Sequence, residues 1–194
     1  DYYQLEKLNP AYKIFFKDDC VTIGDCMDQI CLEFDRIERG SGNQLRSFIK
    51  KAQENYNIAI NKVVLKPGIS PFELVTKDTV LRLDQFFKSI SQEVRKRFEN
   101  PKLISALEFP VLFLGAKPSK TPSFYSFMNF ADFGLGTWHP KGGMYEIIKA
   151  MVQLAQELGV KIHTNHPVDK ILVLDGEICG VRSNGVNLTA DYVI

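Results

Sequence analysis

The chain has 194 residues, of which 45% are hydrophobic and 24% are charged. Its formal net charge is +1, from 24 basic and 23 acidic side chains, so the composition gives no sign of nucleic-acid binding, an acidic tail or a polybasic membrane patch. The length suits one domain or slightly more, and the apolar runs are too short to span a bilayer. We therefore expect a globular chain that buries a core.

The N-terminal part predicts a hairpin followed by helices. β-prone runs at residues 12–16 and 20–23 flank a polar turn, which is the pattern of a short hairpin. Apolar residues then recur at intervals of three and four over residues 27–37 and again over residues 45–56. This spacing predicts two amphipathic helices, and Asp25 is the expected cap of the first.

Further helices are predicted in the middle of the chain. A longer one is expected from about residue 79, with these apolar side chains facing inward: Leu83, Phe86, Phe87, Ile90, Val94 and Phe98. Asn100 is a good cap and Pro101 suits a first helical position, so another helix should reach Leu107. The Thr121-Pro122-Ser123 turn is expected to begin a short aromatic-rich helix over residues 124–133.

Aromatic residues crowd into these predicted helices, since the chain holds 14 Phe and 7 Tyr. Two interpretations of this density stay open. The aromatic faces could be ordinary core, or they could line a long apolar ligand pocket beside the adjoining glycine-rich loop.

That loop, residues 134–144, contains the only Trp of the chain, Trp138, and the pair Gly142-Gly143 directly before a predicted helix over residues 145–158. Glycine permits positive φ or close approach of a ligand, and a helix start offers unpaired N–H groups to an anion. The loop is thus a candidate cofactor or substrate edge. A plain loop-to-helix turn with a packed Trp explains the same pattern.

The C-terminal part predicts half of an α/β unit and then hairpins. Gly159 should end the helix, and the pattern of residues 160–164 predicts a strand. Asp175-Gly176 and Asn184-Gly185 predict turns between strands at residues 168–174, 177–182 and 186–188. Residues 191–194 resemble a buried strand. Because the sequence opens without Met and closes on this run, we expect a fragment of a longer protein.

Complete fingerprints for known chemistries are missing from the sequence. Neither G-x-G-x-x-G after a strand nor the P-loop pattern occurs, and hydrolase and zinc-protease motifs are also missing. The four cysteines and three histidines are not spaced as a metal site, so we predict none. His139, in the glycine-rich loop, is the one histidine that we consider as a proton carrier.

The residues from Gly136 onward nevertheless resemble a known family. The segment GTWHPKGGM before the helix is similar to the phytoene desaturase family. The predicted hairpins that lead into Ala190-Asp191-Tyr192-Val193 are similar to the same family. Its members are carotenoid dehydrogenases and isomerases of the flavin amine oxidase superfamily. Two upstream segments also resemble this family: LEKLNPAY and LFLGAKPS. The chain departs from it at His139, Lys141 and Met144, where the family commonly has Tyr or Phe, Arg, and Thr.

The resemblance implies a two-domain α+β flavoprotein. Residues 1–140 would form a substrate-binding domain, an antiparallel sheet covered by helices. Residues 141–194 would form part of a Rossmann-like FAD-binding domain with a β-meander. The same resemblance places Gly142, Gly143 and Val168 near FAD, and it places Trp138, His139, Pro140, Phe127 and Phe130 near the substrate. It identifies no catalytic base.

The implied activity is FAD-dependent oxidation of C–C to C=C bonds in a carotenoid or other long polyene. Two alternatives stay open: cis–trans isomerisation within the same family, and a non-catalytic polyene- or lipid-binding module. Because such substrates reside in lipid, we expect a cytoplasmic protein that docks peripherally on a membrane. Without the dinucleotide fingerprint, this chain alone should be inactive and should bind FAD weakly or not at all.

Overall fold

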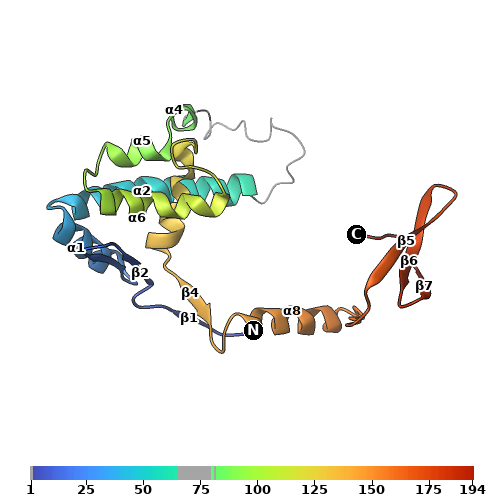
Figure 1. Cartoon of the computed structure of the whole chain (residues 1–194). Helices are drawn as coiled ribbons and strands as arrows, with labels where there is room; N and C mark the ends of the chain where they lie inside the picture. The colour runs from blue at the N-terminus through green and yellow to red at the C-terminus, as the bar shows by residue number, and fades with distance from the viewer. Residues whose placement is uncertain (1, 65–79, 81) are drawn as a thin grey trace. The chain divides into compact units, whose positions relative to one another are not determined.

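The chain forms two compact units (Figure 1). A computed structural model describes residues 2–64, 80 and 82–194. The larger unit comprises Gln4–Lys141, and the smaller one comprises Gly142–Ile194 with Tyr2 and Tyr3. Helices and small antiparallel sheets occur together, which confirms the predicted mixture of helix and antiparallel sheet.

Two strand pairs belong to the larger unit. The predicted hairpin is confirmed as β2 (Tyr12–Phe15) paired antiparallel with β3 (Cys20–Ile23). Alternate residues of β3, Val21 and Ile23, are fully buried, so one face of this hairpin closes the core. The second pair joins β1 (Leu5–Lys7) to β4 (Trp138–Pro140), which come from opposite ends of this unit's sequence.

The two amphipathic helices predicted after the hairpin are present as α1 (Met27–Ile37) and α2 (Ser41–Ile58), and α2 continues into the π-helical turn η1 (Ala59–Val64). The predicted cap Asp25 is wrong. The residue before α1 is Cys26, which makes no side-chain cap. At the start of α2, a side chain of the preceding helix accepts hydrogen bonds from backbone N–H groups that have no partner within α2. The carboxylate of Asp35 accepts from the N–H of Gly40 and of Gly42, both at 2.9 Å.

The single long helix predicted before residue 98 is wrong. Its expected start at Thr79 lies outside the described residues, and the chain beyond it forms two short helices, α4 (Leu83–Phe87) and α5 (Ile90–Arg95). Ser89 separates them because it forms a capping box with Gln92, which starts a new helix. The new helix faces a different way, so Phe87 is 81% exposed while Ile90 and Val94 are buried.

The next helix, α6 (Pro101–Glu108), is confirmed with its predicted cap, since Asn100 Oδ1 accepts from the N–H of Lys102 at 2.9 Å. The predicted aromatic helix is irregular. After the 3₁₀ turn η3 (Phe109–Leu114), the chain passes through η4 (Ser123–Ser126), α7 (Phe127–Asn129) and the π-turn η5 (Phe130–Gly134).

The core of the larger unit lies between the β2–β3 hairpin and helices α1, α2, α5 and α6. Four phenylalanines are at its centre with 2% exposure or less: Phe34, Phe48, Phe98 and Phe133. Phe34 meets Phe98 and Phe133 edge-on, with ring centroids 6.0 and 6.3 Å apart. For these four side chains the core interpretation is therefore the right one.

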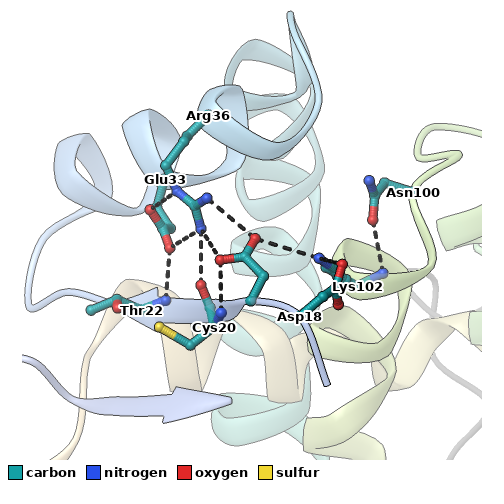
Figure 2. Close-up of polar contacts among 8 residues, drawn as sticks. Asp18, Cys20, Thr22, Glu33, Arg36, Asn100 and Lys102 are labelled. Atoms are coloured by element: carbon teal, nitrogen blue, oxygen red, sulfur yellow. Dashed lines mark hydrogen bonds and ion pairs between the residues drawn. The ribbon is translucent and has the colours of Figure 1, made fainter. Parts of the chain in front are cut away.

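A charged network fastens the hairpin to the helices (Figure 2). Arg36 of α1 bonds both the neighbouring Glu33 and Asp19 in the β2–β3 turn, while Glu33 accepts from the N–H of Thr22 on β3. Lys102 of α6 reaches Asp18 in the same turn at 3.1 Å. Hydrogen bonds from Arg36 lower the pKa of Asp19 and of Glu33. Because these charges are all paired, the cluster is structural.

The smaller unit consists of one helix and a three-stranded meander. The helix α8 (Tyr145–Glu157) is as predicted, and Gly159 follows it with φ of 82°. The meander β5 (Val168–Leu174), β6 (Glu177–Ser183) and β7 (Val186–Thr189) confirms the predicted hairpins. The strands predicted at residues 160–164 and 191–194 are wrong, since both segments are unpaired within the described part of the chain.

Candidate cofactor and substrate sites

The strand β4 positions three of the predicted substrate residues. Its pairing with β1 places Trp138 opposite Lys7, His139 opposite Glu6 and Pro140 opposite Leu5. Since side chains alternate along a strand, Trp138 and Pro140 share one face and His139 lies on the other. The strand therefore does not present the three side chains as one surface.

Trp138 is held in place but remains accessible. Its indole Nε1 donates to the carbonyl of Leu135 at 3.1 Å, and the ammonium of Lys7 lies 5.9 Å from the ring centroid. The side chain of Trp138 is 51% exposed, whereas Pro140 is buried and His139 is half-buried. An ordered aromatic face that stays half-exposed is accessible to a ligand, and the predicted contact of Trp138 with substrate stays a prediction.

Phe127 and Phe130, the other two predicted substrate residues, are both half-buried but belong to different apolar clusters. Phe130 packs against the main core and lies 5.2 Å from Tyr56, ring to ring. Phe127 packs against a second cluster and lies 6.0 Å from Phe124 and 5.4 Å from Tyr125. Each is thus supported by its own aromatic neighbours.

Beside the second cluster lies a buried polar group that sequence reasoning missed. Asn55 of α2 donates to Gln85 Oε1 at 2.7 Å and to Ser126 Oγ at 3.1 Å, and all three residues are buried. The side-chain carbonyl oxygen of Asn55 has no hydrogen-bond partner among the described residues. The sequence did contain a sign of this group. Asn55 falls on the apolar stripe of its helix, where a buried polar side chain requires a hydrogen-bond partner.

Tyr12 and Asp132 form a second pair that sequence reasoning missed. The hydroxyl of Tyr12 on β2 donates to Asp132 Oδ2 on η5 at 2.5 Å. Burial raises the pKa of Asp132, although the bond from Tyr12 acts in the opposite direction. Burial, and next the neighbouring carboxylate, raises the pKa of Tyr12, so the phenol stays neutral. Asp132 is therefore a carboxyl group with enhanced proton affinity close to the turn that leads to Trp138.

In the smaller unit, Gly142 and Gly143 have φ of 92° and 103°, which side-chain-bearing residues rarely adopt. They lead directly into α8, whose first turn carries the acidic residue Glu146. A Cβ on Gly142 would lie only 3.1 Å from the side chain of Glu146. Glu146 is paired with Lys149 at 2.7 Å. The positive φ of both glycines permits the turn into α8, and their predicted contact with FAD stays a prediction.

Val168 lines an apolar cavity of about 270 Å³ on the meander. Val181, Val186 and Leu188 form its other aliphatic walls, and the cavity also borders these polar side chains: His163, His166, Ser183 and Asn184. Ser183 lies opposite Val168 in the strand register, is 3% exposed, and its hydroxyl has no hydrogen-bond partner among the described residues. Because this hydroxyl is itself buried, a ligand in the cavity would contact mainly its aliphatic walls.

Comparison with known proteins decides the family. The sequence pattern of flavin-containing amine oxidoreductases matches residues 44–194. The chain belongs to this family. FAD is accordingly the cofactor that the family uses, as the resemblance implied.

Three similar relatives narrow the comparison to carotenoid enzymes of this flavoprotein family. The chain is 32% identical over 175 residues to a carotenoid 3,4-desaturase of Haloarcula japonica, covering 88% of this chain and 35% of that protein. It is 29% identical over 198 residues to a zeta-carotene-forming phytoene desaturase of Myxococcus xanthus, covering 100% and 38%. It is 31% identical over 202 residues to a 4,4'-diapolycopene oxygenase of Methylomonas, covering 100% and 40%. The predicted resemblance to carotenoid desaturases is confirmed.

The chain spans between 35% and 40% of the length of these relatives. For an amine oxidoreductase, the described residues fit FAD in one respect. The cavity beside Val168 is apolar and large enough for a flat ring. The glycine pair leads into a helix whose first acidic residue, Glu146, is already paired with Lys149, and its predicted role near FAD stays a prediction.

Proposed function

We propose that the chain is part of an FAD-dependent carotenoid desaturase that oxidises C–C to C=C bonds in a polyene. The observation that carries this proposal is the match of residues 44–194 to the flavin-containing amine oxidoreductase family, joined to relatives named as carotenoid desaturases. The enzyme class is thus an oxidoreductase acting on CH–CH groups.

In this proposal the two units have different tasks. The smaller unit belongs to a Rossmann-like FAD-binding domain, and its cavity beside Val168 receives the adenine end of FAD. The larger unit is the substrate domain, with the half-exposed ring of Trp138 and the aromatic side chains of Phe127 and Phe130 contacting the polyene. Support comes from the apolar lining of the cavity and from the exposure of Trp138.

When bound, FAD supplies the acceptor for the hydride that leaves the substrate. The residues of this chain bind and orient an apolar chain and exclude water from it, as aromatic walls do. Asp132 is a carboxyl group of the larger unit whose pKa is raised by burial, and Tyr12 holds its orientation. We assign it no proton-transfer step, since among the described residues the one side-chain hydrogen bond of Asp132 is to Tyr12.

Carotenoids reside in lipid, so we also propose that the protein works as a peripheral membrane protein on the cytoplasmic side. None of the helices within residues 2–64, 80 and 82–194 is long and apolar enough to cross a membrane. Access to the substrate would then depend on surface contact with the bilayer.

A second candidate activity is oxygenation of a carotenoid, because one relative at 31% identity is named as an oxygenase. Mass analysis of the product separates the possibilities. Incubation of the FAD-loaded protein, at its natural length, with phytoene should give a product that has lost pairs of hydrogen atoms. A gain of oxygen would favour the oxygenase, and an unchanged mass with altered chromatographic retention would favour the isomerase and contradict desaturation.

A further inference from the structure

The turn η3 exposes an unusual concentration of apolar side chains. Of its six residues, four are exposed, by 39% to 72%, and we call these four the apolar tip: Phe109, Leu112, Phe113 and Leu114. The two remaining residues, Pro110 and Val111, are buried. Contiguous exposed apolar residues of this size usually mark an interaction surface.

The fold holds this tip in a fixed shape. Val111 is 0% exposed and anchors the turn in the core, while Phe109 meets Phe113 edge-on at 5.4 Å and lies 6.1 Å from Tyr12. The N–H of Gly115 then closes the turn on the carbonyl of Leu112 at 2.9 Å, with Gly115 in the left-handed conformation. The exposed rings are thus presented by a structured turn that follows α6 directly.

Positive charge follows the tip in the sequence. Lys117 and Lys120 are exposed, and neither forms an ion pair with the described residues. The acidic residue directly before the tip, Glu108, is already engaged, since it pairs with Arg95 at 3.4 Å and accepts from Ser91 at 2.6 Å. The tip is therefore an apolar surface flanked by exposed ammonium groups.

We propose that the apolar tip inserts into the surface of an anionic lipid bilayer, with Lys117 and Lys120 contacting the headgroups. This rests on the proposed function, in which the polyene substrate is taken from lipid. Apolar insertion combined with attraction of cations to anionic lipid is how peripheral surfaces bind membranes. An apolar cavity of about 360 Å³ at the base of the tip, lined by Ile14, Phe109, Leu112 and Pro118 with Ser105 and Glu108, offers room for an acyl chain.

A second copy of the chain fits this surface less well. In a two-fold contact through the tip, both copies would bring Lys117 and Lys120 to the interface, and the adjacent acidic residue, Glu108, is already paired with Arg95. Anionic lipid, by contrast, complements both the apolar and the charged parts of the surface.

The test is cosedimentation of the purified 194-residue chain with lipid vesicles, without FAD or carotenoid. Vesicles of phosphatidylcholine mixed with phosphatidylglycerol should bind the chain more tightly than pure phosphatidylcholine. Replacing both Leu112→Ser and Phe113→Ser should weaken binding at least about tenfold, because two inserted apolar side chains are lost. Replacing both Lys117→Gln and Lys120→Gln should weaken binding to the anionic vesicles by roughly thirtyfold, about fivefold for each lysine.

The matched control is Phe87→Ser, which removes an 81% exposed phenylalanine from α4. It should bind vesicles like the unchanged chain, and circular dichroism should show all variants folded. The proposal is overturned if the unchanged chain does not sediment with anionic vesicles, or if Phe87→Ser weakens binding as much as the tip variants do. It is also overturned if the tip variants only abolish a concentration-dependent dimer. Because no substrate is present, a failure of desaturation would leave these results unaffected.

Discussion

Tyr12 and Asp132 lie 120 positions apart in the sequence and share one hydrogen bond of 2.5 Å in the larger unit. Because burial raises the pKa of Asp132 above its ordinary value of 3.8, the folded state favours the protonated form. The stability linked to this group is complete below pH 3.8 and is lost as the pH rises through the raised pKa. The buried carboxyl group therefore weakens the fold at neutral pH.

Asp132→Asn should remove this dependence, since an amide still accepts the bond from Tyr12 but does not ionise. We expect the free energy of unfolding of the variant, relative to the unchanged chain, to increase between about pH 4 and pH 7. Urea unfolding followed by the fluorescence of Trp138, which lies in the same unit, measures it. Asp169→Asn in the smaller unit is the control, and an equal pH dependence in the unchanged chain and in Asp132→Asn would contradict the expected linkage.

Gly143 provides a second test at the scale of one residue. Its φ of 103° is strained for any side chain, although a Cβ there would meet no atom within 4 Å. Gly143→Ala should thus cost about 1–3 kcal/mol through backbone strain alone. Faster amide hydrogen exchange in the first turns of α8 is the expected observation, and Met151→Ala, at an exposed site on the same helix, should leave that turn unchanged. Unchanged amide exchange in the first turns of α8 in Gly143→Ala would contradict the expected backbone strain.

At the scale of elements, the β2–β3 hairpin depends on carboxylates whose pKa values are lowered, whereas the pKa of Asp132 is raised. Hydrogen bonds from Arg36 lower the pKa of Asp19 and of Glu33 below their ordinary values of 3.8 and 4.5. Their contribution to stability is present above these values and is lost as the pH falls through the lowered pKa values. Acid should therefore loosen the hairpin.

Arg36→Gln should remove most of this contribution at neutral pH and leave a shallower loss of stability in acid. Hydrogen exchange at the Thr22 amide, which bonds Glu33, reports on the hairpin directly. Arg39→Gln, a nearby exposed arginine with no bond among the described side chains, serves as the control. Identical acid profiles for the unchanged chain and Arg36→Gln would show that the network does not anchor the hairpin.

Local sequence patterns predicted those elements whose determinants are local. The spacing of Ile30, Cys31 and Phe34 is sufficient to identify α1, and Asn100 with Pro101 is sufficient to start α6. The pattern failed at Ser89, where a capping box interrupts an apolar stripe that continues on both sides. It also failed at residues 160–164, since a strand requires a neighbour that no local pattern supplies.

In the candidate sites, too, the sequence predicted local features and missed contacts between distant segments. Glycine composition and the turn into α8 pointed to Gly142 and Gly143, and the structure gives both a positive φ. The Tyr12–Asp132 pair and the bonds of Asn55 join distant segments, so no spacing rule could have identified the partners. Which predicted residues contact FAD or substrate stays a prediction that rests on family resemblance.

At the scale of the whole molecule, the smaller unit has little enclosed core of its own. Ala150 is the one buried residue of α8, and every residue of β7 is exposed. A cofactor bound there would be covered on few sides, and the sequence lacks the glycine fingerprint that holds pyrophosphate. This supports the expectation that the 194-residue chain binds FAD weakly.

Gel filtration of the chain after incubation with FAD tests this expectation. We predict that the protein peak carries little flavin absorbance, because one apolar cavity with exposed walls cannot retain a dinucleotide during dilution. Bovine serum albumin treated identically sets the background. Flavin coeluting with the chain at a stoichiometric ratio would show that the described residues already form a complete site.

Flavin-linked oxidation of a carotenoid is the central activity that we propose for this protein. The most direct measurement is anaerobic mixing of the protein at its natural length, loaded with FAD, with phytoene in lipid vesicles. We predict that the visible absorbance of oxidised flavin decays while a carotenoid with additional double bonds accumulates in equal amount. Persistent oxidised flavin together with unchanged phytoene, or a product of unchanged mass, would contradict the assignment as a carotenoid desaturase.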